Sequence, residues 1–184
     1  MIKVIATEIV DVKLVEPQWH GDERGFFSET YRSDALTRNG IRDTFVQDNH
    51  SLSITAGTLR GLHFQIPPRA QAKIIRAVRG SILDVAVDIR RSSPTFGQYV
   101  CAELSAENWL QLYIPVGFAH GFLTLTPNTE VIYKVTDYYS PDHDRGILWC
   151  DPDLAIAWPL KDRAPILAQR DKEHPLLRDC PSYF

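Results

Sequence analysis

The chain has 184 residues, and because domains commonly contain about 100 to 200 residues, a single domain is expected over residues 1–184. Hydrophobic residues make up 44% of the chain and charged residues 23%, which is usual for globular proteins and excludes wholesale disorder. The formal net charge of −3 argues against a protein that coats nucleic acid. The net charge does not exclude a small anionic ligand bound by a local group of basic side chains.

The N-terminal segment predicts neither export nor membrane insertion. Residues 1–17 carry acidic side chains among the apolar ones and lack the apolar core and cleavage site of a secretory signal. No stretch approaches the roughly 18 apolar residues of a membrane span. The cysteines, Cys101, Cys150 and Cys180, are odd in number and far apart, which favours free thiols. We therefore expect a soluble, cytoplasmic protein with no membrane partner.

In chain order, the pattern is one of short strands separated by turns. After a β-rich start at residues 2–15, a short helix is predicted from Ser33, as the capping residue, to Asn39-Gly40. Segments rich in Val, Ile, Leu, Tyr and Phe then alternate with turn residues, which is typical of an all-β sandwich or barrel. The predicted strands are residues 73–78, 81–89, 98–104, 118–124, 130–136 and 147–150, with a single helical turn at 105–108.

Two local features add detail to this pattern. Within residues 82–89, Asp84 and Asp88 share one face of the strand, so we expect that face to be polar and wet. From about residue 160 onward, prolines and charges replace the strand pattern. We expect this tail, residues 160–184, to lie over the barrel with one helical turn near residues 167–171.

The most informative segment is Gly57 to Gln65, followed by Lys73 and by a Pro-Val-Gly-Phe-Ala-His segment that ends at His120. This spacing resembles the two cupin motifs, which build a metal site inside a jelly-roll barrel. His63 and His120 match metal ligands, but Gln65 replaces the second histidine and Lys73 stands about where the glutamate would be. A lysine ammonium has no lone pair and repels a cation. We therefore interpret the metal as lost, which leaves a histidine and a lysine suited to abstract a proton beside a carbonyl.

A wider resemblance covers residues 3 to 175. Six segments, residues 22–29, 47–51, 59–65, 84–90, 93–97 and 114–122, look like the signature segments of the dTDP-4-dehydrorhamnose 3,5-epimerases. The resemblance implies a cupin-type jelly roll, an all-β double-stranded β-helix with short peripheral helices. It also implies conversion of dTDP-4-dehydro-6-deoxy-D-glucose to dTDP-4-dehydro-L-rhamnose without a cofactor or metal, in the formation of dTDP-L-rhamnose for polysaccharide.

The resemblance assigns roles to five side chains. It makes His63 the general base, paired with Asp171, which fixes the imidazole tautomer. Lys73 matches the residue that stabilises the enolate oxygen at C4, and Tyr133 matches the acid that reprotonates carbon from the opposite face. Tyr139 is kept as an alternative acid because it has the same strand parity as Tyr133, whereas the family pattern stacks it on the thymine.

The resemblance also implies contacts to the nucleotide and sugar, with arginines suited to the diphosphate by their planar donors. His120 would lie near the reacting sugar. Two positions depart from the pattern, because Arg170 stands where a lysine is often found and Asp144 where a glutamate is usual. The substrate-binding set is Arg24, Glu29, Gln47, Asp48, Asn49, Arg60, His120, Tyr139, Asp144 and Arg170.

Several alternatives remain. A metal-dependent cupin oxygenase would hold iron or another metal on His63 and His120. A non-catalytic sugar-binding cupin module would show no exchange of carbon-bound hydrogen. A relative that inverts only C3 or only C5, or a keto-sugar isomerase, would share nearly all of these residues. The family resemblance further implies a homodimer, with the strands of residues 2–15 adding to the neighbouring sheet.

Overall fold

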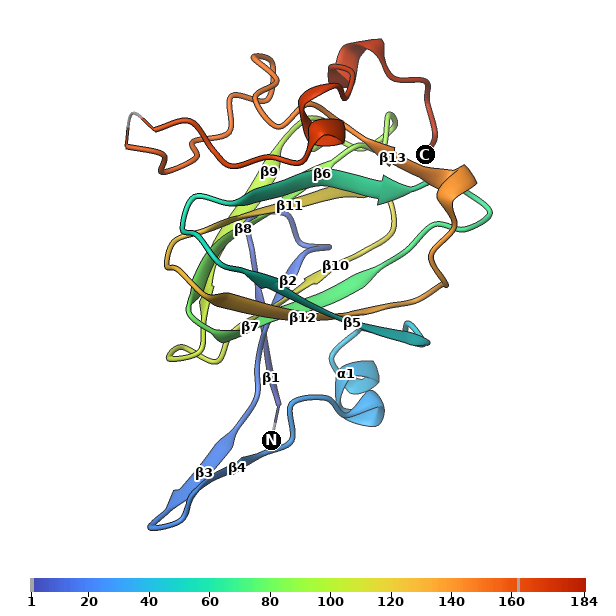
Figure 1. Ribbon diagram of the computed structural model, residues 1–184. Helices are drawn as coiled ribbons and strands as arrows, with labels where there is room; N and C mark the ends of the chain where they lie inside the picture. The colour runs from blue at the N-terminus through green and yellow to red at the C-terminus, as the bar shows by residue number, and fades with distance from the viewer. Residues whose placement is uncertain (1, 162) are drawn as a thin grey trace.

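The computed structural model describes residues 2–161 and 163–184, and its strands form two facing antiparallel sheets and a projecting hairpin (Figure 1). The six-stranded sheet runs in the order β1 (Lys3–Ala6), β2 (Lys13–Glu16), β10 (Gln111–Ile114), β7 (Lys73–Arg79), β12 (Thr129–Val135) and β5 (Gln47–Ser53). The five-stranded sheet runs β13 (Asp144–Gly146), β6 (Leu59–Gln65), β11 (Phe118–Thr124), β8 (Ser81–Asp88) and β9 (Tyr99–Ser105). The hairpin pairs β3 (Trp19–Asp22) with β4 (Gly25–Ser28).

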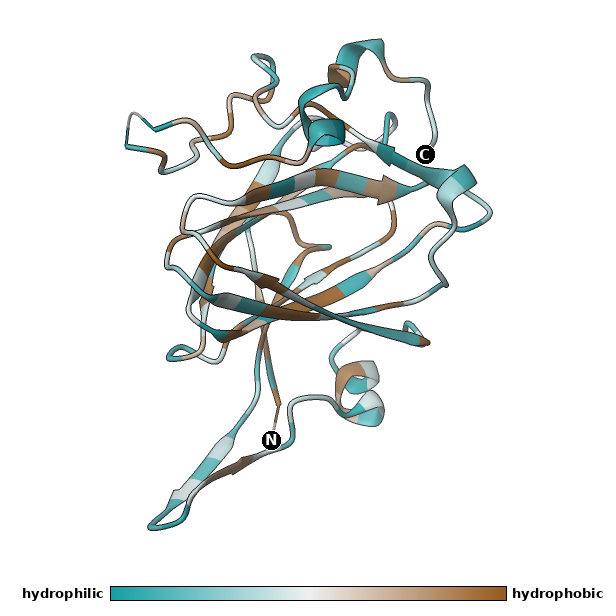
Figure 2. Cartoon of the chain, in the orientation of Figure 1, coloured by the Kyte–Doolittle hydropathy of each residue, from teal (hydrophilic) through white to brown (hydrophobic). Residues whose placement is uncertain are grey.

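The main core lies between the two sheets. Apolar and polar residues alternate along strands such as β12 (Figure 2), so that Val131 and Tyr133 on one side of this strand face the core. Ile75 and Leu112 of one sheet pack with Ile82, Leu104 and Phe122 of the other, and all five are buried. This all-β, cupin-type jelly-roll arrangement confirms the predicted fold class.

The tail covers the outer face of the five-stranded sheet. Leu62, Phe64 and Val85 point outward from their strands and pack against Leu154 and against Leu177 of the tail, which runs above β6 in Figure 1. The tail contains the short 3-10 helices η2 (Gln169–Lys172) and η3 (Leu177–Asp179), after η1 (Pro141–His143). The predicted turn near residues 167–171 is therefore confirmed at η2. That the chain is one independent domain stays a prediction.

The predicted strands match the structure closely with one exception. Five of them begin and end within one residue of β7, β8, β9, β11 and β12. The strand predicted at 147–150 is wrong, because the ladder ends at Gly146 and the chain turns after Leu148. Ile147 is fully buried in the cluster beneath the tail, so its apolar character reflected burial there. Strands β5, β6, β10 and β13 and the hairpin were not predicted individually.

The helix and the predicted polar face also differ in detail. Helix α1 (Ser33–Arg38) ends at Asn39-Gly40 as predicted, but Ser33 is its first residue and Arg32 takes the capping position without a side-chain bond. Burial of Leu36 anchors this short helix instead. The wet face of β8 is wrong, because Asp84 and Asp88 are completely buried and held by hydrogen bonds. None of the helices in the described ranges is long and apolar enough to cross a membrane.

Candidate active site

Two adjoining cavities are lined by strands of both sheets. One has a volume of about 360 Å³ and the other about 340 Å³. His63, Lys73, Tyr133 and Arg170 line both cavities, and Asp171 lines the larger one. The structure therefore brings all four predicted catalytic residues, His63, Lys73, Tyr133 and Asp171, to one place.

Strand β6 places His63 toward the cavities because alternate residues point to opposite faces. Leu62 and Phe64 pack outward under the tail, whereas the side chains of His63 and Gln65 line the smaller cavity, as the strand parity predicts. Gly61 is required here, because a Cβ at this position would lie 2.5 Å from the Gly121 Cα on β11. The absence of a side chain lets the two strands approach closely beside the site.

Asp171, on η2 of the tail, holds His63 in place. His63 Nε2 lies 2.7 Å from Asp171 Oδ1, and the Asp171 side chain is only 3% exposed. Burial alone would raise the pKa of Asp171, but the hydrogen bond and charge of His63 bring it below the ordinary aspartate value. Burial lowers the pKa of His63 despite the opposing effect of Asp171. His63 is therefore neutral near pH 7, with its Nε2–H donating a hydrogen bond to the carboxylate and the ring lone pair on Nδ1.

Lys73 begins β7 and is buried with its ammonium group near the same cavity. Its Nζ donates a hydrogen bond to the His63 carbonyl oxygen at 3.4 Å. Burial lowers the pKa of Lys73 to about 8, while Asp144 and Asp84 act in the opposite direction. The group is thus a cation at neutral pH that gives up its proton far more readily than a surface lysine.

Tyr133 and His63 approach the cavities from opposite walls. Tyr133 lies on β12 of the six-stranded sheet and His63 on β6 of the five-stranded sheet. Burial raises the pKa of Tyr133, so its hydroxyl keeps its proton. The parity argument for Tyr139 is wrong, because β12 ends at Val135 and Tyr139 lies in the following loop. Tyr139 still lines the smaller cavity, where its side chain is largely exposed.

The predicted substrate-binding residues fall into two groups. Arg60 and His120 line the larger cavity, and Gln47, Asn49, Tyr139 and Asp144 line the smaller one, with Arg170 between them. Arg170 pairs with Asp144 at 2.8 Å and lies 3.4 Å from His63 Nδ1. The side chains of this group converge on the space next to His63.

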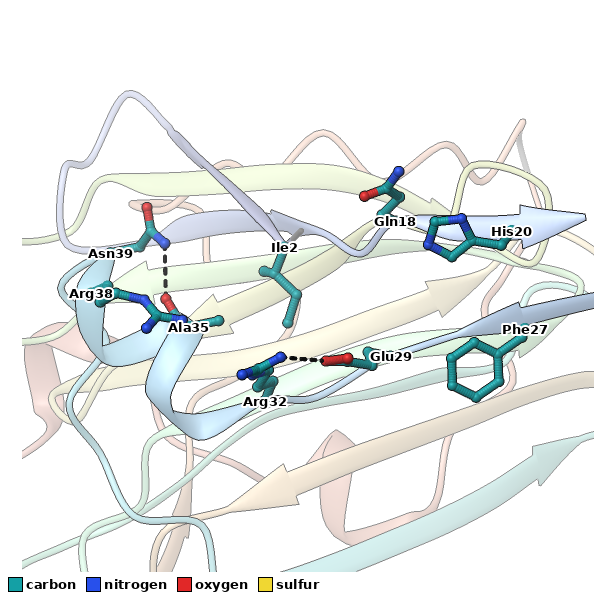
Figure 3. A pocket seen from close by; sticks show the side chains of 9 residues that line it. All are labelled: Ile2, Gln18, His20, Phe27, Glu29, Arg32, Ala35, Arg38 and Asn39. Atoms are coloured by element: carbon teal, nitrogen blue, oxygen red, sulfur yellow. Dashed lines mark hydrogen bonds and ion pairs between the residues drawn. The ribbon is translucent and has the colours of Figure 1, made fainter.

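Three predicted contacts lie elsewhere in the chain. Asp48 projects from the other face of β5 and pairs with Lys134 at 2.7 Å. Arg24 sits in the turn of the hairpin, where it pairs with Asp22. Glu29 lines a separate pocket between the hairpin and α1, beside Arg32 and Phe27 (Figure 3). These three side chains do not reach the His63 cavities of their own chain.

Sequence reasoning missed two partners. His120 Nε2 lies 2.7 Å from Asp84 Oδ1, and both residues are buried. A charged residue inside an apolar strand was the signal for Asp84. His174 lies beside Asp171 and was overlooked, although it follows Asp171 by only three residues. Among the described residues, the side chains close enough to hold a metal are His63, Asp171 and His174, whereas His120 faces Asp84.

The fold and these contacts together define a class of protein. A cupin-type jelly roll encloses a neutral imidazole oriented by a carboxylate, a buried ammonium and a protonated phenol on the opposite wall. Such a set moves protons to and from a carbon atom next to a carbonyl, as general acid–base enzymes do.

Comparison with known proteins identifies the family. The model of the dTDP-4-dehydrorhamnose 3,5-epimerase family matches residues 6–179. The chain is 50% identical to the dTDP-4-dehydrorhamnose 3,5-epimerase of Pseudomonas aeruginosa over 183 residues, 99% of each chain. The dTDP-6-deoxy-D-glucose-3,5-epimerase of Legionella pneumophila, solved with dTDP-4-keto-L-rhamnose, superimposes with a TM-score of 0.94 at 45% identity, covering 99% of this chain and 96% of that chain.

A second solved relative agrees with this result. The dTDP-4-dehydrorhamnose 3,5-epimerase of Bacillus anthracis, with TDP and PPi bound, has a TM-score of 0.92 and 53% identity, covering 96% of this chain and 99% of that chain. The chain belongs to the dTDP-4-dehydrorhamnose 3,5-epimerase family.

Proposed function

We propose that the chain converts dTDP-4-dehydro-6-deoxy-D-glucose to dTDP-4-dehydro-L-rhamnose by inverting C3 and C5. The observation that carries this proposal is the convergence of His63, Lys73 and Tyr133 on shared cavities, with base and acid on opposite walls. The ligands bound in the two solved relatives, TDP with PPi and dTDP-4-keto-L-rhamnose, support a dTDP-sugar as substrate. The product would serve dTDP-L-rhamnose formation.

Proton abstraction begins at His63. The His63 Nε2–H donates a hydrogen bond to Asp171. The proton that leaves C3 or C5 is therefore accepted by Nδ1 of the same ring. General-base catalysis of this kind contributes a factor of ~10² to 10⁴ in rate, which is too little for so weak a carbon acid. The Lys73 ammonium adds a contribution of similar size by stabilising the enolate oxygen at C4, where one preorganised donor is worth roughly 3 to 4 kcal/mol.

Inversion requires a second proton from the other face. Tyr133 delivers this proton from the wall opposite His63. The proton that each inverted carbon receives is therefore not the one that His63 removed. His63 then carries an extra proton and Tyr133 has lost one. Exchange with solvent restores both groups before the second carbon reacts, which predicts that solvent hydrogen enters at C3 and at C5.

The remaining parts of the substrate would lie in different cavities. Arg60 and Arg170 offer planar donors to the diphosphate oxygens. Gln47 and Asn49, together with Tyr139 and Asp144, line the smaller cavity and would contact the nucleotide end. The largely exposed Tyr139 ring suits stacking on thymine better than proton donation. His120, held by Asp84, lies beside the reacting sugar in the larger cavity.

We also propose a homodimer. Phe26 and Phe27 on the projecting hairpin are 64% and 68% exposed, and exposed aromatic clusters mark interaction sites. β1 is an edge strand whose free side can pair with another chain. A second copy seated there would cover the hairpin and could receive Arg24 and Glu29, which do not reach their own cavities.

A cytoplasmic location is part of the proposal and is supported by three free cysteines.

One experiment tests the proposed reaction. The protein is incubated with dTDP-4-dehydro-6-deoxy-D-glucose in D₂O, and the product is analysed by NMR. We expect deuterium at both C3 and C5 and the L-rhamno configuration. Label at only one carbon would assign a mono-epimerase, a displaced carbonyl would assign a ketoisomerase, and no label would leave only a binding role.

A further inference from the structure

A second imidazole lies against the carboxylate that orients His63. His174 Nε2 is 3.6 Å from Asp171 Oδ1, the same oxygen that His63 Nε2 approaches at 2.7 Å. The rings of His63 and His174 meet nearly edge to face, with centroids 5.5 Å apart. The proposed reaction uses only one of the two imidazoles, so the role of His174 is unassigned.

The fold makes room for the His174 ring. Gly146 on β13 pairs with His63 on β6, and a Cβ at Gly146 would collide with the His174 ring. In this setting His174 Nε2 is buried and has no hydrogen-bond partner among the described residues. A buried polar atom without a partner is costly, and a ligand that accepts this nitrogen lone pair would remove that cost.

We propose that His63 Nε2, Asp171 Oδ1 and His174 Nε2 form a binding site for a divalent transition-metal ion, with Zn²⁺ as the best match. One donor atom from each of the three side chains lies within 4.8 Å of the other two, and zinc favours imidazole nitrogen with carboxylate oxygen. Zinc–ligand bonds of about 2.0 to 2.2 Å place tetrahedral donors roughly 3.3 to 3.6 Å apart. The spacings of 2.7 and 3.6 Å therefore need only side-chain adjustment.

Two cations oppose binding and limit its strength. The Arg170 guanidinium lies 3.3 Å from His63 Nε2, and Lys73 is buried nearby. Arg170 is 53% exposed and also pairs with Asp144, so it can turn away from His63 and keep a partner. We therefore expect weaker binding than at a dedicated structural zinc site.

Zinc at this site would switch off the base. A metal bond to His63 Nε2 moves the ring proton from Nε2 to Nδ1, where the lone pair that accepts hydrogen from carbon is consumed. The net charge of the imidazole does not change and no other reactant is needed. Inhibition rests on the proposed function, whereas metal binding does not, so the two can fail separately.

Binding is tested by calorimetric titration of ZnCl₂ into the protein in a buffer that does not coordinate metal. We expect one zinc per chain in the wild-type protein. His174→Gln should weaken this binding by at least about tenfold, because even the loss of an indirect ligand contact costs about 10- to 100-fold in affinity. His50→Gln is the matched control, since His50 also lies against a carboxylate, that of Glu130, but on the surface. It should leave the affinity unchanged.

Two further measurements keep the proposal testable if His174→Gln misfolds. In the wild-type protein, zinc should shift the ring ¹⁵N resonances of His63 and His174 and not those of His50. Arg170→Gln, which removes a competing cation, should bind zinc more tightly than the wild type. In epimerase assays, zinc should abolish wild-type turnover and EDTA should restore it. Unchanged affinity in His174→Gln, shifts confined to other histidines, or weaker binding in Arg170→Gln would each overturn the site.

Discussion

At the scale of single residues, His63 uses one ring nitrogen for orientation and the other for chemistry. Asp171 accepts a hydrogen bond from Nε2–H at 2.7 Å, which selects the tautomer with the lone pair on Nδ1. The buried carboxylate also stabilises the imidazolium that forms when carbon is deprotonated. His50 and His143 do not line either cavity, so neither of them is placed to act on a substrate bound there.

Replacing the base should stop the reaction before any proton leaves carbon. His63→Ala removes the only imidazole that both lines the cavities and is oriented by Asp171 among the described residues. We expect exchange at C3 and C5 to fall by ~10³ or more, at the upper end of general-base effects. NMR of the substrate in D₂O measures this. His50→Ala is the control, and exchange that persists in His63→Ala would assign the base elsewhere.

Lys73 should set the alkaline limit of activity. Its ammonium stabilises the enolate only while it is protonated, and burial lowers its pKa to about 8. The charged form is therefore lost as the pH rises through about 8, and kcat should fall there. Lys73→Met should lower kcat by ~10² to 10³ at pH 7 and abolish that alkaline limb. A wild-type kcat that is flat up to pH 10 would contradict this role.

At the scale of elements, the site depends on where strands and tail meet. The strand positions of β7, β8, β11 and β12 could be predicted because buried short strands carry dense β-branched and aromatic residues between turn signals. The end of the ladder at Gly146 could not be predicted, because the next residue, Ile147, is apolar and continues the strand pattern. Its side chain instead packs in the cluster beneath the tail. The burial of Asp84 could not either, since its partner His120 comes from another strand.

The site was predicted to the extent that its residues carry a motif. His63, Lys73, Tyr133 and Asp171 follow from the resemblance, and the structure brings them together. Asp48 belongs to the same signature segment as Gln47 and Asn49, but alternation along β5 turns its side chain to the other face. Spatial pairings such as His174 with Asp171 depend on the path of an irregular tail, which no periodicity describes.

The end of β8 gives a prediction about stability. Asp88 accepts hydrogen bonds from Arg90, Ser93 and Thr95 while completely buried, and these bonds bring its pKa to about 2 although burial opposes them. Because the folded pKa is depressed, this stabilisation is present above the ordinary aspartate range and is lost as the pH falls toward 2. Asp88→Asn should lower the free energy of unfolding by roughly 3 kcal/mol.

Urea denaturation at pH 7 measures this loss. The exposed Asp142 provides the control, since Asp142→Asn should change the unfolding free energy by less than about 0.5 kcal/mol. Equal stabilities of the two variants would mean that the Asp88 network does not hold the end of the strand.

At the scale of the whole molecule, the hairpin carries large aromatic side chains that stay exposed to solvent. It projects away from the barrel (Figure 1), and Trp109 is its aromatic contact on the barrel, through Trp19 and Phe26. Phe27 remains 68% exposed beside Glu29. A dimer would bury this surface and bring the substrate contacts of the hairpin near a second set of cavities.

Light scattering after size-exclusion chromatography tests the dimer. The wild type should elute with twice the chain mass of 20.9 kDa, and Phe27→Asp should elute as a monomer with a raised KM. Ile54→Asp alters another exposed apolar residue and should remain dimeric. A monomeric wild type with full activity would refute the proposed assembly.

Substitution of Tyr133 separates proton removal from proton return. Tyr133→Phe keeps His63, Asp171 and Lys73 but removes the hydroxyl on the opposite wall. Incubated with substrate in D₂O and followed by NMR, this variant should still exchange hydrogen at the carbon next to the ketone while forming almost no inverted product. Loss of exchange and inversion in equal measure would contradict a mechanism with base and acid on opposite walls.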